Sequence, residues 1–179
     1  MPTKQSSIAT FAGGCFWCMQ HVFDGLPGVT ESIVGYTGGG KLNPTYQQVC
    51  SGTTGHLEAI QIEFDPTLIE YASLVETFLH NIDPTNSKGQ FADIGSQYCT
   101  AVFYQDDLQK QIAENLFDNI ISSGQLDVIY TKILPAVKFY PAEEYHQKYP
   151  EKNQERYMSY HIACRRDFGL KNIWKGKKS

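Results

Sequence analysis

The stretch Thr10–Phe23, TFAGGCFWCMQHVF, sets two glycines ahead of two cysteines that flank a Phe-Trp pair. An apolar run leads into the glycines, and apolar residues then recur at helical spacing, which predicts a strand that turns into a helix. Cys15 is expected at the start of that helix, where the helix dipole and free backbone N–H groups stabilise a thiolate. We therefore expect Cys15 to have a lowered pKa and to act as a nucleophile; a buried, unreactive cysteine is the alternative.

Cys18 follows Cys15 by one helical turn. This spacing lets a second thiol attack an oxidised first thiol and form a disulfide, and packing of Cys18 into the core is the alternative. Phe16 and Trp17 take no part in thiol exchange itself. Their size suggests a hydrophobic pocket beside the nucleophile, although core packing is a competing interpretation for Phe16.

The composition of the whole chain narrows the class of protein. With 179 residues, 41% of them hydrophobic, residues 1–179 are expected to form a single catalytic domain. A net charge of −4 offers no basic surface for nucleic acid, and no apolar run reaches the roughly 20 residues of a membrane span. The chain starts without the pattern of a secretory leader, so we expect a cytoplasmic protein whose five cysteines are reduced and serve metal or redox chemistry.

The order of predicted elements indicates an α+β fold. Strands are expected within residues 6–14, 29–40, 56–66 and 96–104 and as two short pieces within 128–140. Helices are expected over residues 15–24, 71–82 and 106–122 and after Pro141, and residues 43–55 read as a loop with one helical turn. The polar loop Asp83–Gly95 is long enough to suggest a function. The basic segment from about residue 165 to 179 is expected to be a flexible tail.

Glu58 stands at one end of the predicted strand over residues 56–64. Because side chains alternate along a strand, it falls on the same face as the apolar residues Ile60, Ile62 and Phe64. A carboxyl on that face loses solvent, which raises its pKa and makes Glu58 a candidate proton donor. A salt-bridged or edge-exposed glutamate is the alternative.

The motifs GGCFWC, GYTGG, NPTYQQVCSGTTGHLEA, DIGSQY and FYPAEEYHQKY occur in this order over about Phe11–Tyr149. Together they resemble the A-type peptide methionine sulfoxide reductases. The resemblance implies an α+β two-layer sandwich with a ferredoxin-like core, in which flanking helices and long loops surround a mixed sheet. It also implies reduction of the S epimer of methionine sulfoxide, free or in proteins, with thioredoxin as the reductant. We expect no cofactor and a monomer.

The resemblance assigns the chemistry residue by residue. Cys15 matches the nucleophile that attacks the sulfoxide sulfur and becomes a sulfenic acid, and Glu58 matches the acid that protonates the departing oxygen. Tyr46 and Tyr98 match the two tyrosines whose hydroxyls hold the sulfoxide oxygen. Without the family, either tyrosine would be read as an ordinary packed ring with its hydroxyl in water.

The remaining matches concern binding, and two positions depart from the pattern. Phe16 and Trp17 match the aromatic pocket for the S-methyl group, and Asp93 matches the acid near the substrate backbone. Cys99 stands where the family usually has Arg, and we interpret it as structural. Gln20 replaces a common Glu, which predicts the loss of one local ion pair.

Recycling of the sulfenic acid is the step that the sequence leaves open. The chain lacks the glycine-rich, cysteine-bearing tail that resolves the sulfenic acid in many relatives. Cys18 is the first candidate because it lies one turn from Cys15, and Cys164 is the second because a mobile tail would bring it in. Direct reduction by an external thiol is the third route, whereas Cys50 is expected to pack in the core.

The same residues are compatible with three other classes of protein. A metal site would use Cys15, Cys18 and His21, but structural zinc needs four ligands and no second pair has matching spacing. A thioredoxin-like disulfide oxidoreductase explains Cys15 and Cys18 and gives no role to Glu58. A non-catalytic interaction domain predicts a Cys15 that does not react with alkylating agents at neutral pH.

Overall fold

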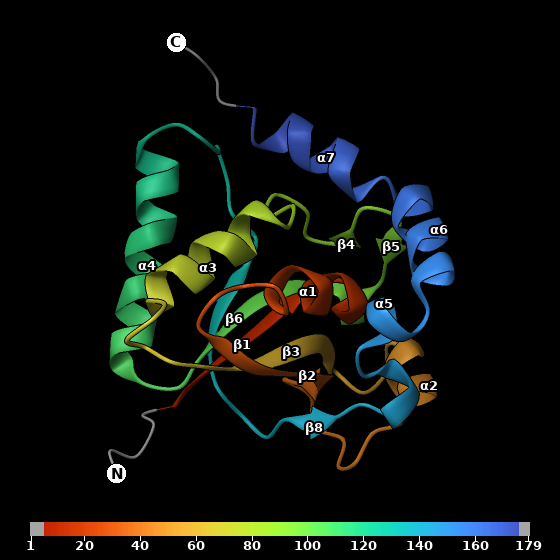
Figure 1. Ribbon diagram of the computed structural model, residues 1–179. Coiled ribbons are helices and arrows are strands. Elements are labelled where there is room, and N and C mark those ends of the chain that lie inside the picture. The colour runs from red at the N-terminus through yellow and green to blue at the C-terminus, as the bar shows by residue number, and fades with distance from the viewer. Residues whose placement is uncertain (1–5, 176–179) are drawn as a thin grey trace.

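The computed structural model describes residues 6–175, which form a mixed sheet covered by helices (Figure 1). The six strands run in the order β7-β6-β1-β3-β2-β8. All neighbouring strands are antiparallel except β6 and β7, which are parallel. Their bounds are β1 (Ser7–Gly13), β2 (Val29–Thr37), β3 (Leu57–Phe64), β6 (Thr100–Tyr104), β7 (Lys132–Pro135) and β8 (Tyr140–Pro141). The predicted α+β class is confirmed.

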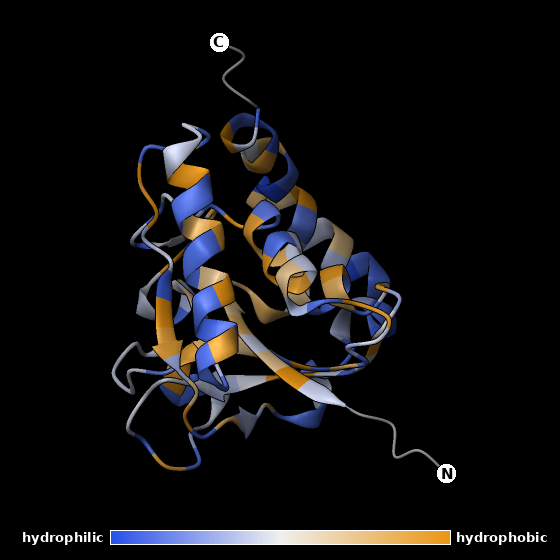
Figure 2. Ribbon diagram, turned by 90° about the vertical axis from the view of Figure 1, so that its left-hand side faces the viewer, coloured by the Kyte–Doolittle hydropathy of each residue, from blue (hydrophilic) through white to orange (hydrophobic). Residues whose placement is uncertain are grey.

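Three helices pack on one face of the sheet and enclose the main core (Figure 1). They are α1 (Phe16–Phe23), α3 (Tyr71–His80) and α4 (Asp107–Ser122). In the core Phe11 stacks between Phe23 and Phe78, with ring centroids 5.5 and 4.8 Å away. Helix α4 carries both hydrophobic and hydrophilic residues, as an amphipathic covering helix must (Figure 2). Alternate residues of the strands, among them Ala12, form a second and smaller apolar cluster.

The irregular segments contain short elements that the sequence pattern did not separate. Helix α2 (Tyr46–Cys50) is the predicted single turn, and a capping box at Thr45 caps its N-terminus. The long polar loop holds a two-stranded ribbon of β4 (Gly89–Gln90) and β5 (Asp93–Ile94). The strand predicted over residues 96–104 begins as a 3-10 turn, η1 (Ser96–Tyr98), before it becomes β6. Within the described residues, no helix has the length and apolar character needed to cross a bilayer.

The helix predicted directly after Pro141 is wrong in its extent. The chain forms a 3-10 turn, η2 (Glu144–His146), and a separate short helix, α5 (Tyr149–Lys152). Gln147 lies between them in an extended conformation, and its amide bonds both Val34 N and Val34 O at 3.0 and 2.8 Å. Lys148 adopts a left-handed conformation with φ of 54°. These bonds to strand β2 outweigh the local helix preference.

The prediction of a flexible tail from about residue 165 is also wrong for most of that segment. Residues 154–164 form α6 (Gln154–Cys164), and residues 166–173 form α7 (Arg166–Ile173). Arg166 is buried and donates to Gly13 O at 3.0 Å and Asn81 O at 2.6 Å, which anchors the segment to the end of β1. A basic composition alone does not distinguish a buried arginine from a solvated one. The last part of the predicted tail, residues 176–179, lies outside the described residues.

Candidate active site

Cys15 is the N-cap residue of helix α1, at the turn from strand β1, as the sequence predicts. Its carbonyl accepts the first bonds of the helix, from Cys18 N at 3.1 Å and Met19 N at 3.4 Å. Gly14 has a φ of +83°, and a Cβ at this position would lie 2.6 Å from Gln90 Cβ. Only glycine allows this turn and this close approach, so the Gly-Gly pair sets where the Cys15 thiol lies.

Glu58 is buried beneath the same turn, with 2% of its surface exposed, as strand parity predicted. Its Oε2 accepts a hydrogen bond from Phe16 N, the first amide of α1, at 3.1 Å. Burial is the main cause that raises the pKa of Glu58 to about 8, against the opposing effect of that bond; the charges of Asp93 and Cys18 add to the rise. Glu58 is therefore a protonated carboxylic acid near neutral pH, which is the state that a proton donor needs.

A cavity of about 220 Å³ joins these two residues to the other predicted site residues. We call it the catalytic cavity, and it is lined by Cys15, Phe16, Trp17, Tyr46, Glu58, Asp93, Tyr98 and Tyr160. Seven of these eight residues were candidates from the sequence, and the seven come from five separate elements. Their catalytic and binding roles remain predictions, but the fold brings all seven to one small space.

Tyr46 and Tyr98 reach the cavity from α2 and η1. Burial raises the pKa of both phenols well above the ordinary range, and the nearby Glu58 adds to the rise. Both hydroxyls therefore stay protonated and can donate hydrogen bonds to an oxygen placed in the cavity. The backbone N of Tyr46 donates to Glu143 Oε1 at 3.1 Å, which ties helix α2 to the segment after β8.

Trp17 forms an aromatic wall of the cavity and is held from two directions. Its ring stacks on Tyr149 with centroids 3.8 Å apart, and its Nε1 donates to His146 Nδ1 at 3.2 Å. His146 is buried, and burial lowers its pKa, which favours the neutral imidazole that accepts this bond. Phe16 packs against the same imidazole with centroids 5.1 Å apart. This wall is apolar and has little freedom to move.

Tyr160 is the lining residue that sequence reasoning missed. It comes from helix α6 and donates a short hydrogen bond to Asp93 Oδ2. Burial is the first cause that raises the pKa of Asp93, and it raises the pKa of Tyr160 as well. The signal in the sequence was weak, because Tyr160 lies beyond the last recognised motif, in a segment for which no helix was predicted.

The two cysteines of helix α1 differ from the expectation in their acidity. Burial raises the pKa of Cys15 well above its usual value, and the neighbouring Cys18 and Glu58 add to the rise. The hydrogen bond with Cys15 lowers the pKa of Cys18 to about 4 against its burial, with further help from His161 and Arg166. The predicted lowering of the Cys15 pKa is therefore wrong, because loss of solvent and a neighbouring negative charge outweigh the helix start. The pair titrates as a unit that carries one proton and one negative charge near neutral pH.

The other departures noted in the sequence have local explanations. Cys164 is buried in helix α6, where its Sγ donates to His161 O at 3.2 Å, so it does not belong to a mobile tail. Cys99 is half-buried, with its Sγ 3.5 Å from Ser87 O. Gln20 is fully buried; its amide donates to Ser32 Oγ at 3.1 Å and accepts from Lys148 N at 2.7 Å. A carboxylate there would still accept the bond from Lys148 N but would lose the bond donated to Ser32.

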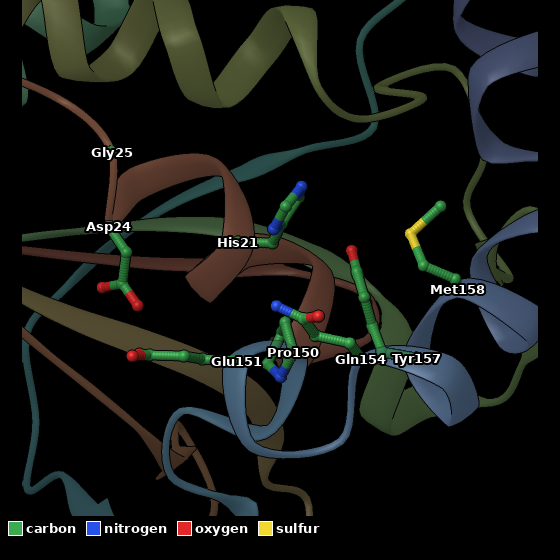
Figure 3. Close-up of a pocket in the computed structure, with 8 residues that line it drawn as sticks. All are labelled: His21, Asp24, Gly25, Pro150, Glu151, Gln154, Tyr157 and Met158. Carbon is green, nitrogen blue, oxygen red and sulfur yellow. The ribbon is translucent and has the colours of Figure 1, made fainter.

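Another cavity, of about 590 Å³, lies between helix α1 and the α5–α6 segment (Figure 3). It is lined by His21, Asp24, Gly25, Pro150, Glu151, Gln154, Tyr157 and Met158, none of which the sequence singled out as a catalytic residue. Within residues 6–175, no group of three or more His, Cys, Asp or Glu side chains is arranged to hold a metal ion. The arrangement in the catalytic cavity is instead an acid, two phenol donors and a thiol around an apolar wall.

Comparisons with known proteins agree on one family. Residues 7–178 match the family model described as peptide methionine sulfoxide reductase. The chain is 51% identical to the peptide methionine sulfoxide reductase MsrA of Bacillus licheniformis over 176 residues, which cover 98% of this chain and 97% of the relative. It is similar in structure to the reduced form of Mxr1 from Saccharomyces cerevisiae, with a TM-score of 0.78 and 31% identity over 87% of this chain and 89% of that chain. The chain is also similar to Mxr1 in the structure of its complex with Trx2, with 23% identity and a TM-score of 0.57 over 83% of this chain and 87% of that chain. This likeness shows the fold alone.

We expect the Glu58→Gln substitution to remove a pH dependence of stability. Below the ordinary pKa of 4.5, the Glu58 carboxyl is protonated in the folded and the unfolded chain, and the stability that its raised pKa contributes is fully present. As the pH rises from 4.5 toward about 8, only the unfolded carboxyl ionises, so the free energy of unfolding falls. Urea unfolding at about pH 5 and about pH 8 should favour the variant more at the higher pH. An equal difference between variant and wild type at both values would contradict a raised pKa.

Proposed function

The chain belongs to the peptide methionine sulfoxide reductase family, and from this premise we propose how the residues of its catalytic cavity share the reaction. The protein is a peptide-methionine (S)-S-oxide reductase, which reduces methionine S-sulfoxide to methionine. One observation carries the assignment of roles: the Cys15 thiol and the protonated Glu58 carboxyl line the same small cavity.

The first step transfers oxygen from the substrate sulfur to Cys15. The Cys15 sulfur attacks the sulfoxide sulfur while Glu58 gives its proton to the sulfoxide oxygen, and the thiol proton passes along the hydrogen bond to Cys18. The products are the thioether and a Cys15 sulfenic acid, so the substrate is reduced by two electrons and Cys15 is oxidised by two. Tyr46 and Tyr98 donate hydrogen bonds to the oxygen as negative charge develops on it.

Binding of the substrate divides between the apolar and the polar sides of the cavity. Phe16 and Trp17 would receive the S-methyl group, because their rings are held in place by packing against His146 and Tyr149. Asp93, fixed by its bond from Tyr160, would bind the substrate backbone. With methyl group, oxygen and backbone assigned to three different walls, only one epimer presents its sulfur to Cys15.

The second step restores Cys15 through a disulfide. The proton taken up by Cys18 moves to Glu58, whose pKa of about 8 makes it the weaker acid, and the Cys18 thiolate attacks the Cys15 sulfur. The S–S bond forms, the S–O bond breaks, and the oxygen takes the proton of Glu58 and leaves as water. A thioredoxin-type dithiol then reduces the disulfide; the complex of the relative Mxr1 with Trx2 supports this class of reductant.

The finer description of the fold belongs to the same proposal. The order β6-β1-β3-β2, with helices α1 and α3 in the connections, supports a ferredoxin-like core within a two-layer sandwich. Cytoplasmic location, a monomeric state and a single catalytic domain stay predictions from the sequence. A disulfide oxidoreductase that uses only Cys15 and Cys18 is disfavoured, because it gives no role to a buried, protonated Glu58.

Stoichiometric incubation with each epimer of methionine sulfoxide, without a reductant, tests the assignment of the nucleophile. The S epimer should yield one methionine per chain and the R epimer none, and Cys15→Ser should abolish the reaction because a hydroxyl is a far weaker nucleophile than a thiolate. Cys99→Ser is the matched control, since Cys99 is half-buried and does not line the catalytic cavity. Turnover of the R epimer, or activity in the Cys15→Ser variant, would overturn the assignment.

Glu58→Gln should slow methionine formation by about 10² to 10⁴ and leave substrate binding in place, because a general acid is lost while the shape is kept. Glu63→Gln, on the same strand with its side chain on the opposite face, is the matched control. Single-turnover rates give the chemical step, and thiol–disulfide exchange should persist in the variant. A change confined to KM would mean that Glu58 only positions the substrate.

Peptide mapping after one turnover without reductant should find Cys15 linked to Cys18. Residues three apart on a first helical turn lie about 5 to 6 Å apart at Cβ, and a disulfide needs about 3.5 to 4.5 Å. Modest fraying of this turn, whose first N–H groups have no helical partner, would bring the two sulfurs to bonding distance. Cys18→Ser should allow the first turnover, accumulate the sulfenic acid, and sharply reduce repeated turnover with thioredoxin. Cys164→Ser should recycle normally, and a Cys15–Cys164 linkage would transfer the resolving role to helix α6.

A further inference from the structure

Cys18 lines a cavity of its own, of about 320 Å³, that shares no residue with the catalytic cavity. It is lined by Cys18, His21, Val22, Asn81, Tyr157, Met158, His161, Arg166, Asp167 and Leu170. His21, Tyr157 and Met158 also line the larger cavity of Figure 3, so the two spaces adjoin along helices α1 and α6. The mechanism so far uses only Cys18 from this group, and the cationic residues around it are unexplained.

His161 connects Cys18 to an acidic side chain. Its Nε2 lies 3.1 Å from Asp167 Oδ1, and its ring lines the same cavity as Cys18. The interaction with Cys18 is the first cause that raises the pKa of His161, and Asp167 adds to the rise. The Tyr157 hydroxyl is 3.4 Å from His161 Nδ1, and Tyr157 packs against Cys18. Asp167 and Tyr157 thus orient the imidazole in the cavity that Cys18 lines.

Arg166 supplies a second positive charge, and it has no carboxylate partner among the described residues. Its two terminal nitrogens bond only neutral carbonyl groups, Gly13 O and Asn81 O, and its Nε is buried without a partner. Arg166 is 3% exposed, and a buried cation needs an anion nearby to offset its desolvation; the charges of Asp93 and Cys18 both interact with it. Cys18 faces it from helix α1.

We propose that Arg166 and the Asp167-oriented His161 form a cationic site that holds Cys18 as the thiolate which resolves the Cys15 sulfenic acid. The proposal rests on the recycling route given above. Arg166 and His161 are positioning residues, because they act through the Cys18 sulfur and do not touch the substrate cavity. The titratable and charged groups that face Cys18 are Cys15 and His21 on α1, Glu58 on β3, Asp93 on β5, Tyr157, His161 and Cys164 on α6, and Arg166 and Asp167 on α7.

The cationic site explains why Cys18 gives up its proton readily. The proton that Cys18 took from Cys15 moves to Glu58, and the lone pair of the Cys18 thiolate then forms the S–S bond. The electrons of the broken S–O bond leave with the oxygen, which becomes water with the proton of Glu58. The imidazolium and the guanidinium keep their protons throughout and are left unneutralised until a dithiol reductant restores the Cys18 thiolate.

A titration of Cys18 in the Cys15→Ser background tests the proposal, because serine keeps a hydrogen-bond donor beside Cys18. The ultraviolet absorbance of the thiolate is followed against pH, and the same variant that also carries Cys18→Ser is subtracted. His161→Gln should raise the titration midpoint by about one unit or more, and Asp167→Asn by less. His21→Gln is the matched control, since His21 lines the same cavity but, among the described residues, lacks the carboxylate partner that Asp167 gives His161. If His161→Gln does not fold, Asp167→Asn still provides the test, because the Asp167 side chain is 70% exposed and its replacement disturbs no core packing.

Single-turnover kinetics in the Cys15-containing chain give the second measurement. In the His161→Gln variant, the pH below which the rate of disulfide formation falls (the acid limb of the profile) should rise together with the Cys18 titration midpoint. The pH profile of methionine formation, measured in the same sample, is the reference. Midpoints and acid limbs equal to those of His21→Gln would overturn the proposal. Failure of the recycling route has a separate signature, because a wild-type chain that recycles without a Cys15–Cys18 disulfide refutes that route whatever the titration shows.

Discussion

The hydrogen bond from Phe16 N to the buried Glu58 carboxyl is the contact on which the site depends. It joins the first turn of helix α1 to the central strand β3, and so places an acid beside the thiol that caps the helix. The tight Gly13–Gly14 turn and the bond from Arg166 to Gly13 O hold the other side of the same junction. A carboxyl that accepts a helix amide would ordinarily become more acidic, but here burial is the larger effect, so Glu58 keeps its proton.

In this site the pKa values of the acidic groups are set by their surroundings and not by residue type. Glu58 is a carboxylic acid that stays neutral, Cys15 is a thiol that stays neutral, and Cys18 is a thiol that ionises, and all three lie at the first turn of helix α1. The difference between the two cysteines is their surroundings. Cys15 faces the substrate cavity with Glu58 and Tyr160, whereas Cys18 faces His161 and the buried Arg166. Such a separation of pKa values between neighbours is how one active site performs both a proton-donating step and a nucleophilic step.

The sequence was sufficient where a feature depends on local pattern. Strand parity predicted that Glu58 is buried, and the glycine-cysteine turn predicted the helix start at Cys15, because both follow from period and backbone conformation. Prediction from the sequence failed where contacts between distant segments determine a pKa or the end of a helix. The acidity of Cys15 depends on burial and on Cys18, and the break at Gln147 depends on Val34 of another strand. Neither can be read from neighbouring residues.

The C-terminal segment shows most clearly what composition conceals. Helix α6 has little amphipathic character, so its pattern gave no helix, yet it faces both cavities. Tyr160 reaches the catalytic cavity, while Tyr157 and His161, three residues before and one after it, reach the Cys18 cavity. Both cavities thus share one rigid helix, and the site of the leaving oxygen and the site of the attacking thiolate are fixed relative to each other. A segment for which the sequence pattern predicts no helix therefore supplies one wall of each cavity, and both steps depend on that enclosure.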